Sequence, residues 1–274
     1  MKHNGFTSID KELVRKLRLY QKINIPEGIE NIKKNAFSNN KSIEILKLPN
    51  SLLRIGANAF ANTGIKRAYV PSNVRFISVS PFCYCLQLEE INVDVNNKYF
   101  YSVDGVLYSK CKQMLKEYPA GKRQEEFSIP EGVKTIEAKA FTGNKYLRKI
   151  NIPRSMEVIS SRAFHGWDGV EEFTVPQWIT RIESKAFSYC GMLKKIYIPH
   201  GVYVAPDAFE GSDNVNIQYS AIMPQKGIIC PKIKVKRIEK KHANEHNQLI
   251  LSYKFQTNPI FITQVEHAYS TYCK

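Results

Sequence analysis

The chain has 274 residues, 43% of them hydrophobic, which suffices to bury the core of one large domain or two smaller ones and excludes an intrinsically disordered chain. Its 40 basic and 25 acidic residues give a formal net charge of +15, which favours acidic partners, anionic surfaces or nucleic acid through non-specific electrostatic attraction. No stretch approaches the roughly 18 apolar residues that a membrane-spanning helix needs.

The N-terminal segment, residues 1–22, carries charges throughout and has no apolar run of the ~7–15 residues found in a secretory signal. As the chain stands, we expect a cytoplasmic protein; the alternative is a cell-surface or secreted protein whose export signal has been removed. Residues 8–21 predict a short amphipathic helix that caps the segment that follows. Its N-cap would be Ser8 or Asp10, and its apolar face would hold Leu13, Leu17 and Tyr20.

Residues 23–217 repeat two markers at a nearly constant spacing. An apolar residue followed by proline recurs at steps of 23, 22, 59, 23, 23 and 23 residues, at Pro26, Pro49, Pro71, Pro130, Pro153, Pro176 and Pro199. A phenylalanine, usually preceded by alanine, follows each proline after 11 residues, or 10 in the last unit, at Phe37, Phe60, Phe82, Phe141, Phe164, Phe187 and Phe209. Two markers with one period predict seven or eight structural units of 22–23 residues.

Such a unit cannot bury its apolar face alone and must stack on its neighbours, so the repeat predicts a solenoid. The segment before each proline, such as LRKINIP at 147–153, ends in alternating apolar and polar residues, which indicates a strand. Because each unit returns the chain to the same edge, these strands should lie parallel and about 4.8 Å apart. The phenylalanines should form a stacked spine through one continuous interior.

The unit I-P-x-x-V-x-x-I-x-x-x-A-F-x-x-C-x-x-L-x-x-I resembles the BspA-type leucine-rich repeat, a family with Cys or Asn after A-F. This resemblance covers residues 23–217. It implies a mainly β, right-handed leucine-rich-repeat solenoid with a parallel concave sheet. Members of this family are often surface-exposed proteins implicated in adhesion to host or matrix proteins, so the resemblance also implies an adhesin-like role.

The long step of 59 residues contains an insert at residues 94–127. Asp104-Gly105 lies between FYSV and VLYS and predicts a two-residue hairpin turn, because both positions favour positive φ. A third strand is expected at residues 113–119. We therefore expect a small antiparallel β-hairpin flap on the solenoid, and a structural role is favoured over a binding role.

The outward side chains of the strands are the candidate partner-binding residues. If the residues one and three places before proline point inward, those two and four places before it point outward. Binding hot spots favour Tyr, Trp and Arg, and the competing interpretation is a merely solvated strand face. The candidates at these positions are Lys47, Arg67, Tyr69, Lys195 and Tyr197. Trp178 is a further candidate, because its slot after the proline holds Gly, Ser or Asn in most other units.

Residues 218–274 leave the repeat and contain strand-like runs at 232–238, 248–255 and 259–265, which predict a C-terminal β cap or a small β subdomain. The basic run at 232–241 could form a nucleic-acid patch. We favour a sheet edge that lysines protect from pairing with other strands.

Catalytic and metal-binding motifs are weak. His242, Glu245 and His246 match H-x-x-E-H, but charged and polar neighbours favour a solvated turn over a zinc helix. Cys83 and Cys85 lie beside the repeat phenylalanine Phe82, and we therefore favour a packing role for them over metal binding. We therefore expect no enzyme, no catalytic residue, no metal and no cofactor.

The sequence predicts a non-enzymatic recognition scaffold that binds a protein partner on its concave face. The alternative is a nucleic-acid or polyanion binder that acts through its basic surface.

Overall fold

The computed structural model describes residues 7–16 and 21–220, all of which belong to one compact unit. The predicted runs at 232–265 and the H-x-x-E-H string lie outside the described residues, as do Leu17 and Tyr20. Within the described part of the chain, no helix is long and apolar enough to cross a membrane.

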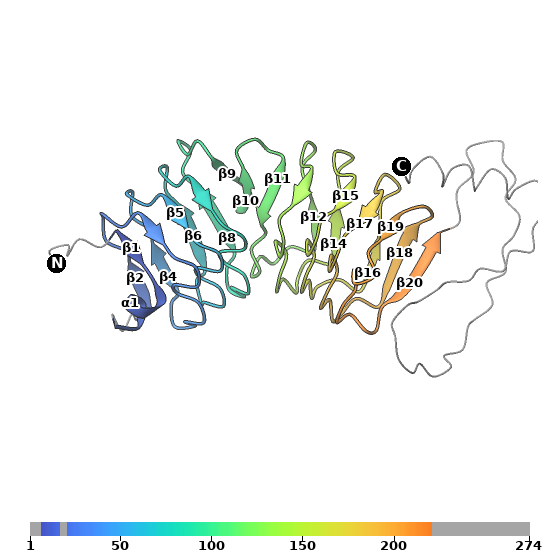
Figure 1. The fold of residues 1–274 in the computed structure, drawn as a ribbon, viewed down its shortest axis with the longest axis horizontal. Helices are drawn as coiled ribbons and strands as arrows, with labels where there is room; N and C mark the ends of the chain where they lie inside the picture. Colours follow the sequence, from blue (N-terminus) through green and yellow to red (C-terminus); the bar gives the residue numbers. More distant parts are fainter. Residues whose placement is uncertain (1–6, 17–20, 221–274) are drawn as a thin grey trace, which may run out of the picture. The chain divides into compact units, whose positions relative to one another are not determined.

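Each coil of the repeat contributes one longer strand before its proline position, and we call these the major strands. They are β2 (Lys22–Asn24), β4 (Ile45–Lys47), β6 (Arg67–Val70), β8 (Glu90–Val93), β12 (Glu126–Ser128), β14 (Lys149–Asn151), β16 (Glu172–Thr174), β18 (Lys195–Pro199) and β20 (Asn216–Ser220). They pair in parallel as β2-β4-β6-β8, β12-β14 and β16-β18-β20, and Figure 1 shows them in this sequence order. The predicted parallel pairing is therefore confirmed.

A second, shorter strand follows in each coil, and we call these the minor strands. They are β1 (Ser8–Ile9), β3 (Asn31–Ile32), β5 (Arg54–Ile55), β7 (Phe76–Ile77), β11 (Met114–Glu117), β13 (Thr135–Ile136), β15 (Val158–Ile159), β17 (Arg181–Ile182) and β19 (Tyr203–Val204). β1 pairs in parallel with β3, so a partial coil already precedes the first proline.

The predicted N-terminal helix is present as α1 (Lys11–Lys16), directly after β1. Asp10 is its N-cap, because its carboxylate accepts the backbone N–H of Leu13 at 3.0 Å. This hydrogen bond lowers the pKa of Asp10. Val14 is buried and joins the core of the first coils, which is the packing expected of a capping helix.

The turn around each phenylalanine explains why these rings stack. Asn35 and Asn39 flank Phe37 and adopt positive φ of 58° and 66°, a conformation that asparagine tolerates better than most residues. The turn directs the Phe37 N–H to the Ala59 carbonyl of the next coil at 2.7 Å. This coil-to-coil bond sets one ring above the next.

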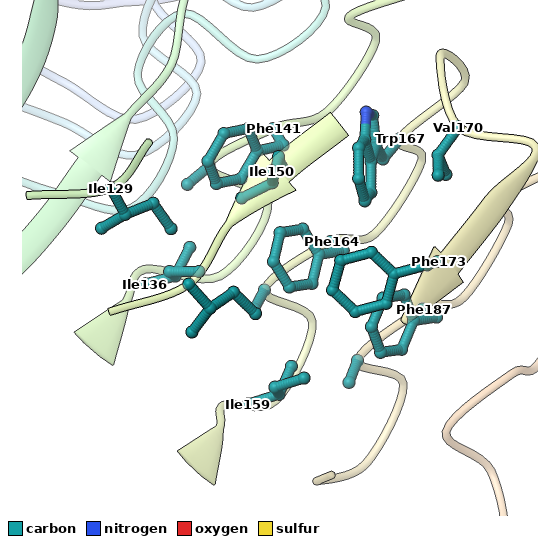
Figure 2. Close-up of a cluster of buried hydrophobic side chains, with 14 of the residues drawn as sticks. Ile129, Ile136, Phe141, Ile150, Ile159, Phe164, Trp167, Val170, Phe173 and Phe187 are labelled. Carbon is teal, nitrogen blue, oxygen red and sulfur yellow. The ribbon is translucent and has the colours of Figure 1, made fainter. Parts of the chain in front are cut away.

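The aromatic spine forms as predicted within two groups of coils. Ring centroids are 5.1 Å apart for Phe37 and Phe60, and 5.3 Å apart for Phe60 and Phe82. The second group runs through Phe141, Phe164, Phe187 and Phe209 at spacings of 5.4, 5.1 and 5.6 Å. Figure 2 shows three of these rings, those of Phe141, Phe164 and Phe187, beside the fully buried Trp167.

The expectation of one continuous interior was wrong. The buried side chains form two clusters: an N-terminal core from Ile9 to Leu107 and a C-terminal core from Val106 to Ala208. The insert lies where they meet. The hairpin is confirmed as β9 (Phe100–Val103) and β10 (Val106–Ser109), joined by the predicted Asp104-Gly105 turn.

The hairpin is not the expected flap on the outside of the solenoid, because side chains of β10 are buried in the two cores. Val106 and Tyr108 of β10 pack in the C-terminal core, whereas Leu107 packs in the N-terminal core, so the strand forms a wall between the two. The hairpin tip touches β8, because the Ile91 N–H donates to the Gly105 carbonyl at 2.8 Å. A Cβ at Gly105 would lie 2.6 Å from a side-chain atom of β8, so only glycine fits there.

The third strand of the insert belongs to a further coil that the proline and phenylalanine markers do not reveal, and we call it the hidden coil. β11 pairs antiparallel with β10 and in parallel with the minor strand β13, so it takes a minor-strand position. Tyr118 follows it and stands 23 residues before Phe141, in the place of a spine phenylalanine. Its N–H donates to the Ala140 carbonyl at 2.8 Å, as a spine phenylalanine would. The stack therefore contains one more coil than the phenylalanines mark.

A buried polar cluster joins the two groups of coils. The Lys116 ammonium donates to the Ile77 carbonyl at 3.0 Å and to the Glu137 carboxylate at 2.7 Å. The Glu117 carboxylate accepts the Phe82 N–H at 3.2 Å, and burial raises the pKa of Glu117 to about 8. Hydrogen bonds from Lys116 and to Glu117 thus bridge the point at which the ring stack is interrupted.

Candidate protein-binding face

The predicted alternation of side chains on the major strands is confirmed. The middle residue of each three-residue strand is buried and its two neighbours are exposed, as in β4 and β14. We define the major face as the first and third side chains of the strands β2 to β18. It consists of Lys22, Asn24, Ile45, Lys47, Arg67, Tyr69, Glu90, Asn92, Glu126, Ser128, Lys149, Asn151, Glu172, Thr174, Lys195 and Tyr197.

The structure brings Arg67 and Tyr69 together on β6. The Arg67 Nε lies 3.0 Å from the Glu90 carboxylate on the neighbouring strand β8. The Tyr69 hydroxyl donates to the Asp94 carboxylate at 2.8 Å, and this bond raises the pKa of Tyr69. Tyr69 nevertheless remains 52% exposed, so its ring is held in place and still accessible.

A shallow groove of about 460 Å³ lies beside Tyr69 and is lined by Ile45, Arg67 and Asn92 among others. Ile45 is 51% exposed and adds an apolar side chain to the lining of this groove. Lys47 is exposed on the same strand. Sequence reasoning placed Ile45 on this face but did not select it as a binding residue.

Lys195 and Tyr197 form a second patch on β18. The Lys195 ammonium lies 5.6 Å from the centroid of the Tyr197 ring and 3.8 Å from the Glu172 carboxylate. Both residues are half-buried. This patch is therefore less accessible than the one on β6.

Trp178 does not lie on a strand of the major face. It follows β16, packs partly against the C-terminal core and donates its indole N–H to the Pro153 carbonyl at 2.9 Å. The Arg154 guanidinium lies 5.6 Å from its ring centroid. A groove of about 360 Å³ connects Trp178 with Asn151 and Thr174 of the major face. The tryptophan therefore borders the major face and is not one of the outward strand side chains that form it.

Charges on the major face are largely paired across neighbouring strands. The Lys149 ammonium lies 2.7 Å from the Glu126 carboxylate, in the same arrangement as the Arg67–Glu90 and Lys195–Glu172 pairs. Exposed pairs of this kind contribute little to stability, about 0–1 kcal/mol. They do make the face a mixed polar surface, so its chemistry is not that of a uniformly basic patch.

Three of the four described cysteines are buried, whereas Cys111 is exposed. Cys85 and Cys190 are buried, and their thiols donate to the carbonyls of Phe60 at 3.0 Å and Phe164 at 3.1 Å, as their repeat positions predict. His165 is half-buried, with its Nδ1 and the Ser188 Oγ 2.8 Å apart. No group of three or more metal-ligating side chains occurs among the described residues.

Comparisons with known proteins agree with this architecture. Residues 3–114 and 118–226 match the BspA type leucine rich repeat region in 6 copies. A leucine rich cell surface protein from Faecalibacterium prausnitzii is similar in structure, with 26% sequence identity and a TM-score of 0.64, over 79% of this chain and 64% of that chain. A comparison with curated proteins found no match.

Two further solved structures share the fold. One is a leucine-rich repeat protein from Eubacterium ventriosum, at 24% identity and a TM-score of 0.61, over 71% of this chain and 59% of that one. The other is the pneumococcal vaccine antigen PcpA, at 23% identity and a TM-score of 0.59, over 74% of this chain and 57% of that one. The chain thus spans less than two thirds of the length of all three similar proteins.

Proposed function

The chain belongs to the BspA-type leucine-rich repeat family, and from this premise we propose that it is a non-enzymatic recognition scaffold that binds a protein partner on the major face. Repeat solenoids offer an extended surface whose side chains are fixed by short, mutually paired strands. Binding sites on such rigid elements lose little conformational entropy when a partner docks.

The arrangement around Tyr69 is the observation that carries this proposal. An accessible aromatic ring is held by a hydrogen bond to Asp94, with the Arg67 guanidinium and the exposed Ile45 side chain lining the same groove. Tyrosine and arginine beside an apolar surface are the residue types that dominate binding energy at protein interfaces. Lys195 and Tyr197 supply a second contact region on the same face, and Trp178 borders it.

We propose a cell-surface or secreted setting rather than a cytoplasmic one, with an adhesin-like role. Support comes from the similar protein of Faecalibacterium prausnitzii, which is described as a cell surface protein. The role in adhesion also follows from what the resemblance to this family implies.

A nucleic-acid or polyanion binder is the second candidate, favoured by the net charge of +15. Because the charges on the major face are largely paired, a polyanion would bind elsewhere on the molecule under this alternative. Polyanion binding would fall steeply with salt because counterions are released on binding. Binding to duplex DNA and to heparin at two salt concentrations therefore separates the two candidates.

The proposal is tested with the full chain immobilised and exposed to extracts of the source organism and to purified matrix proteins. The variants are Arg67→Ala/Tyr69→Ala/Tyr197→Ala and, as a control, Tyr203→Ala. Tyr203 is 53% exposed, like Tyr69, but lies on the minor strand β19. We expect a protein that the wild type and the control retain and the triple variant loses. A retained protein that binds all three forms equally would contradict binding on the major face.

A further inference from the structure

A hollow in the described part of the chain lies at the break between β8 and β12 and contains none of the candidate residues of the major face. It has a volume of about 1080 Å³, and we call it the seam groove. Its lining includes Leu86, Gly121, Arg123, Tyr146, Asp168 and Met192, which come from five successive coils. Neighbouring coils lie about 4.8 Å apart, so the four spacings between these five coils add up to roughly 19 Å. An extended chain of about six residues, at ~3.3 Å each, has this length.

The hidden coil creates this groove. Six residues after the spine ring, the neighbouring coils bury Leu88 and Leu147, whereas the hidden coil has the exposed Gln124 at this place. Only three residues after Tyr118, the Gly121 N–H already donates to the Leu88 carbonyl of the preceding coil, at 2.8 Å. No strand pairing then connects β8 to β12. A missing leucine and an interrupted sheet together leave the surface hollow.

Apolar side chains are exposed at both ends of the groove. Leu86 is 56% exposed at one end, and Met192 is 46% exposed at the other. Tyr146 is half-buried between them. Apolar side chains that line a concave surface are typical of a binding site rather than of an ordinary solvated surface.

Unpaired cations surround Tyr146. The Arg123 guanidinium lies 5.6 Å and the Lys145 ammonium 5.5 Å from its ring centroid. Arg148 also lines the groove, and none of these three cations forms an ion pair with a described residue. Such a cluster attracts carboxylates, since guanidinium and ammonium groups bind them through charge-assisted hydrogen bonds.

The acidic side chains of the groove only partly balance these cations. The Glu171 carboxylate is already paired with Lys194 at 2.9 Å. Asp168 also lines the groove, and burial raises the pKa of its carboxyl. Glu89 lines the opposite side of the groove, and Lys66 there pairs with Glu44 at 2.9 Å. The unpaired charge near Tyr146 is therefore positive.

We propose that the seam groove binds an extended, acidic peptide segment of a partner protein, in which carboxylates alternate with apolar side chains. The carboxylates would meet Arg123, Lys145 and Arg148, and the apolar side chains would cover Leu86, Tyr146 and Met192. Alternation suits an extended chain, because successive side chains point to opposite sides. The seam groove shares Lys66 and Glu89 with the groove beside Tyr69 but contains no residue of the major face, so the proposal does not rest on the function proposed above.

Gly191 provides a way to block the groove without straining the fold. It lines the groove, and a Cβ built on it meets no atom within 4 Å. The blocking variant is Gly191→Trp, and the charge variant is Arg123→Glu/Lys145→Glu. Lys34→Glu/Lys41→Glu is the matched control, because both lysines are exposed on the first coils and outside the groove. Thermal unfolding of each variant checks that it is folded.

The probe is a fluorescein-labelled peptide of 12 residues in which Glu alternates with Leu and Tyr, measured by fluorescence polarisation with the full chain. We expect saturable binding that weakens at least about tenfold, or about 1.4 kcal/mol, in both groove variants and stays within about threefold in the control. Replacing Leu and Tyr of the peptide by Ser, or Glu by Lys, should also abolish binding.

Three results would overturn the proposal. The first is no binding of the acidic peptide to the wild type. The second is equal binding to the folded groove variants and the control. The third is equal binding of the Ser-substituted peptide or of heparin at the same site, since that would show a general polyanion surface.

Discussion

The ring of Tyr118 stacks on that of Phe141 with centroids 5.2 Å apart, although its hydroxyl is buried without a hydrogen-bond partner. Tyr118→Phe should therefore raise the free energy of unfolding, because an unsatisfied buried hydroxyl costs about 1–3 kcal/mol. Tyr118→Ala should lower it by about 3–5 kcal/mol through cavity formation. Denaturant unfolding measures both, and a clear loss of stability in Tyr118→Phe would show that the hydroxyl has a partner.

Losing a buried phenylalanine of the spine should cost more stability than losing an exposed phenylalanine outside it. Phe164 is fully buried and contacts rings on both sides, so Phe164→Ala should cost about 3–5 kcal/mol. Phe76 is 53% exposed and lies under the Arg54 guanidinium, so Phe76→Ala should cost at most about 1 kcal/mol. Unfolding in urea compares the two variants. Equal costs would contradict the stacked interior.

Stability should fall as the pH rises through the range in which Glu117 titrates. Burial raises the pKa of this carboxyl from 4.5 to about 8 in the folded chain. The folded state thus favours the protonated form, and the stability that this gives is complete below pH 4.5 and lost as the pH approaches 8. Burial also raises the pKa of the neighbouring Glu137, which acts in the same direction.

Glu117→Gln isolates this effect, because the amide keeps the shape of the side chain and an oxygen for the Phe82 N–H. Its free energy of unfolding should fall less than that of the wild type between pH 5 and pH 8, by at least about 1 kcal/mol, the equivalent of nearly one pKa unit. Urea unfolding at several pH values provides the comparison. Parallel pH profiles for the two proteins would rule out Glu117 as the titrating group.

Cys111 should react with alkylating agents far faster than the other described cysteines. It is exposed, and a hydrogen bond with the Ser109 hydroxyl lowers its pKa. Burial raises the pKa of Cys83, Cys85 and Cys190 to about 12. Because the thiolate is the reactive form, iodoacetamide in native buffer should modify Cys111 and spare these three, as peptide mass spectrometry can show. Denaturant should make all four react, and fast native labelling of Cys85 would contradict its packing role.

The regular coils could be predicted from the sequence because proline and phenylalanine keep a fixed spacing. The hidden coil could not be recognised from those markers, since Tyr118 replaces the phenylalanine and Pro119 follows it. One signal was present: Tyr118 precedes Phe141 by 23 residues, and Phe127 follows it by 9, as Ile150 follows Phe141. The hairpin turn was predictable from Asp104-Gly105. Its place between two cores was not, because that depends on which neighbours its alternating side chains meet.

The candidate face was predictable to the level of which side chains point outward, because a strand alternates its two faces. The contacts that hold those side chains were not, since Asp94 and Pro153 lie in turns whose paths the repeat pattern does not specify. The seam groove could not be foreseen either, because it arises from a leucine that is absent and a strand pairing that does not form.

The affinity of the captured partner protein for the wild type and for Arg67→Ala/Tyr69→Ala/Tyr197→Ala, measured by surface plasmon resonance, tests binding on the major face most directly. Loss of two or three hot-spot side chains should weaken binding by at least about 100-fold, or ~3 kcal/mol, while Tyr203→Ala binds like the wild type. A triple variant that folds normally and binds within about threefold of the wild type would contradict it.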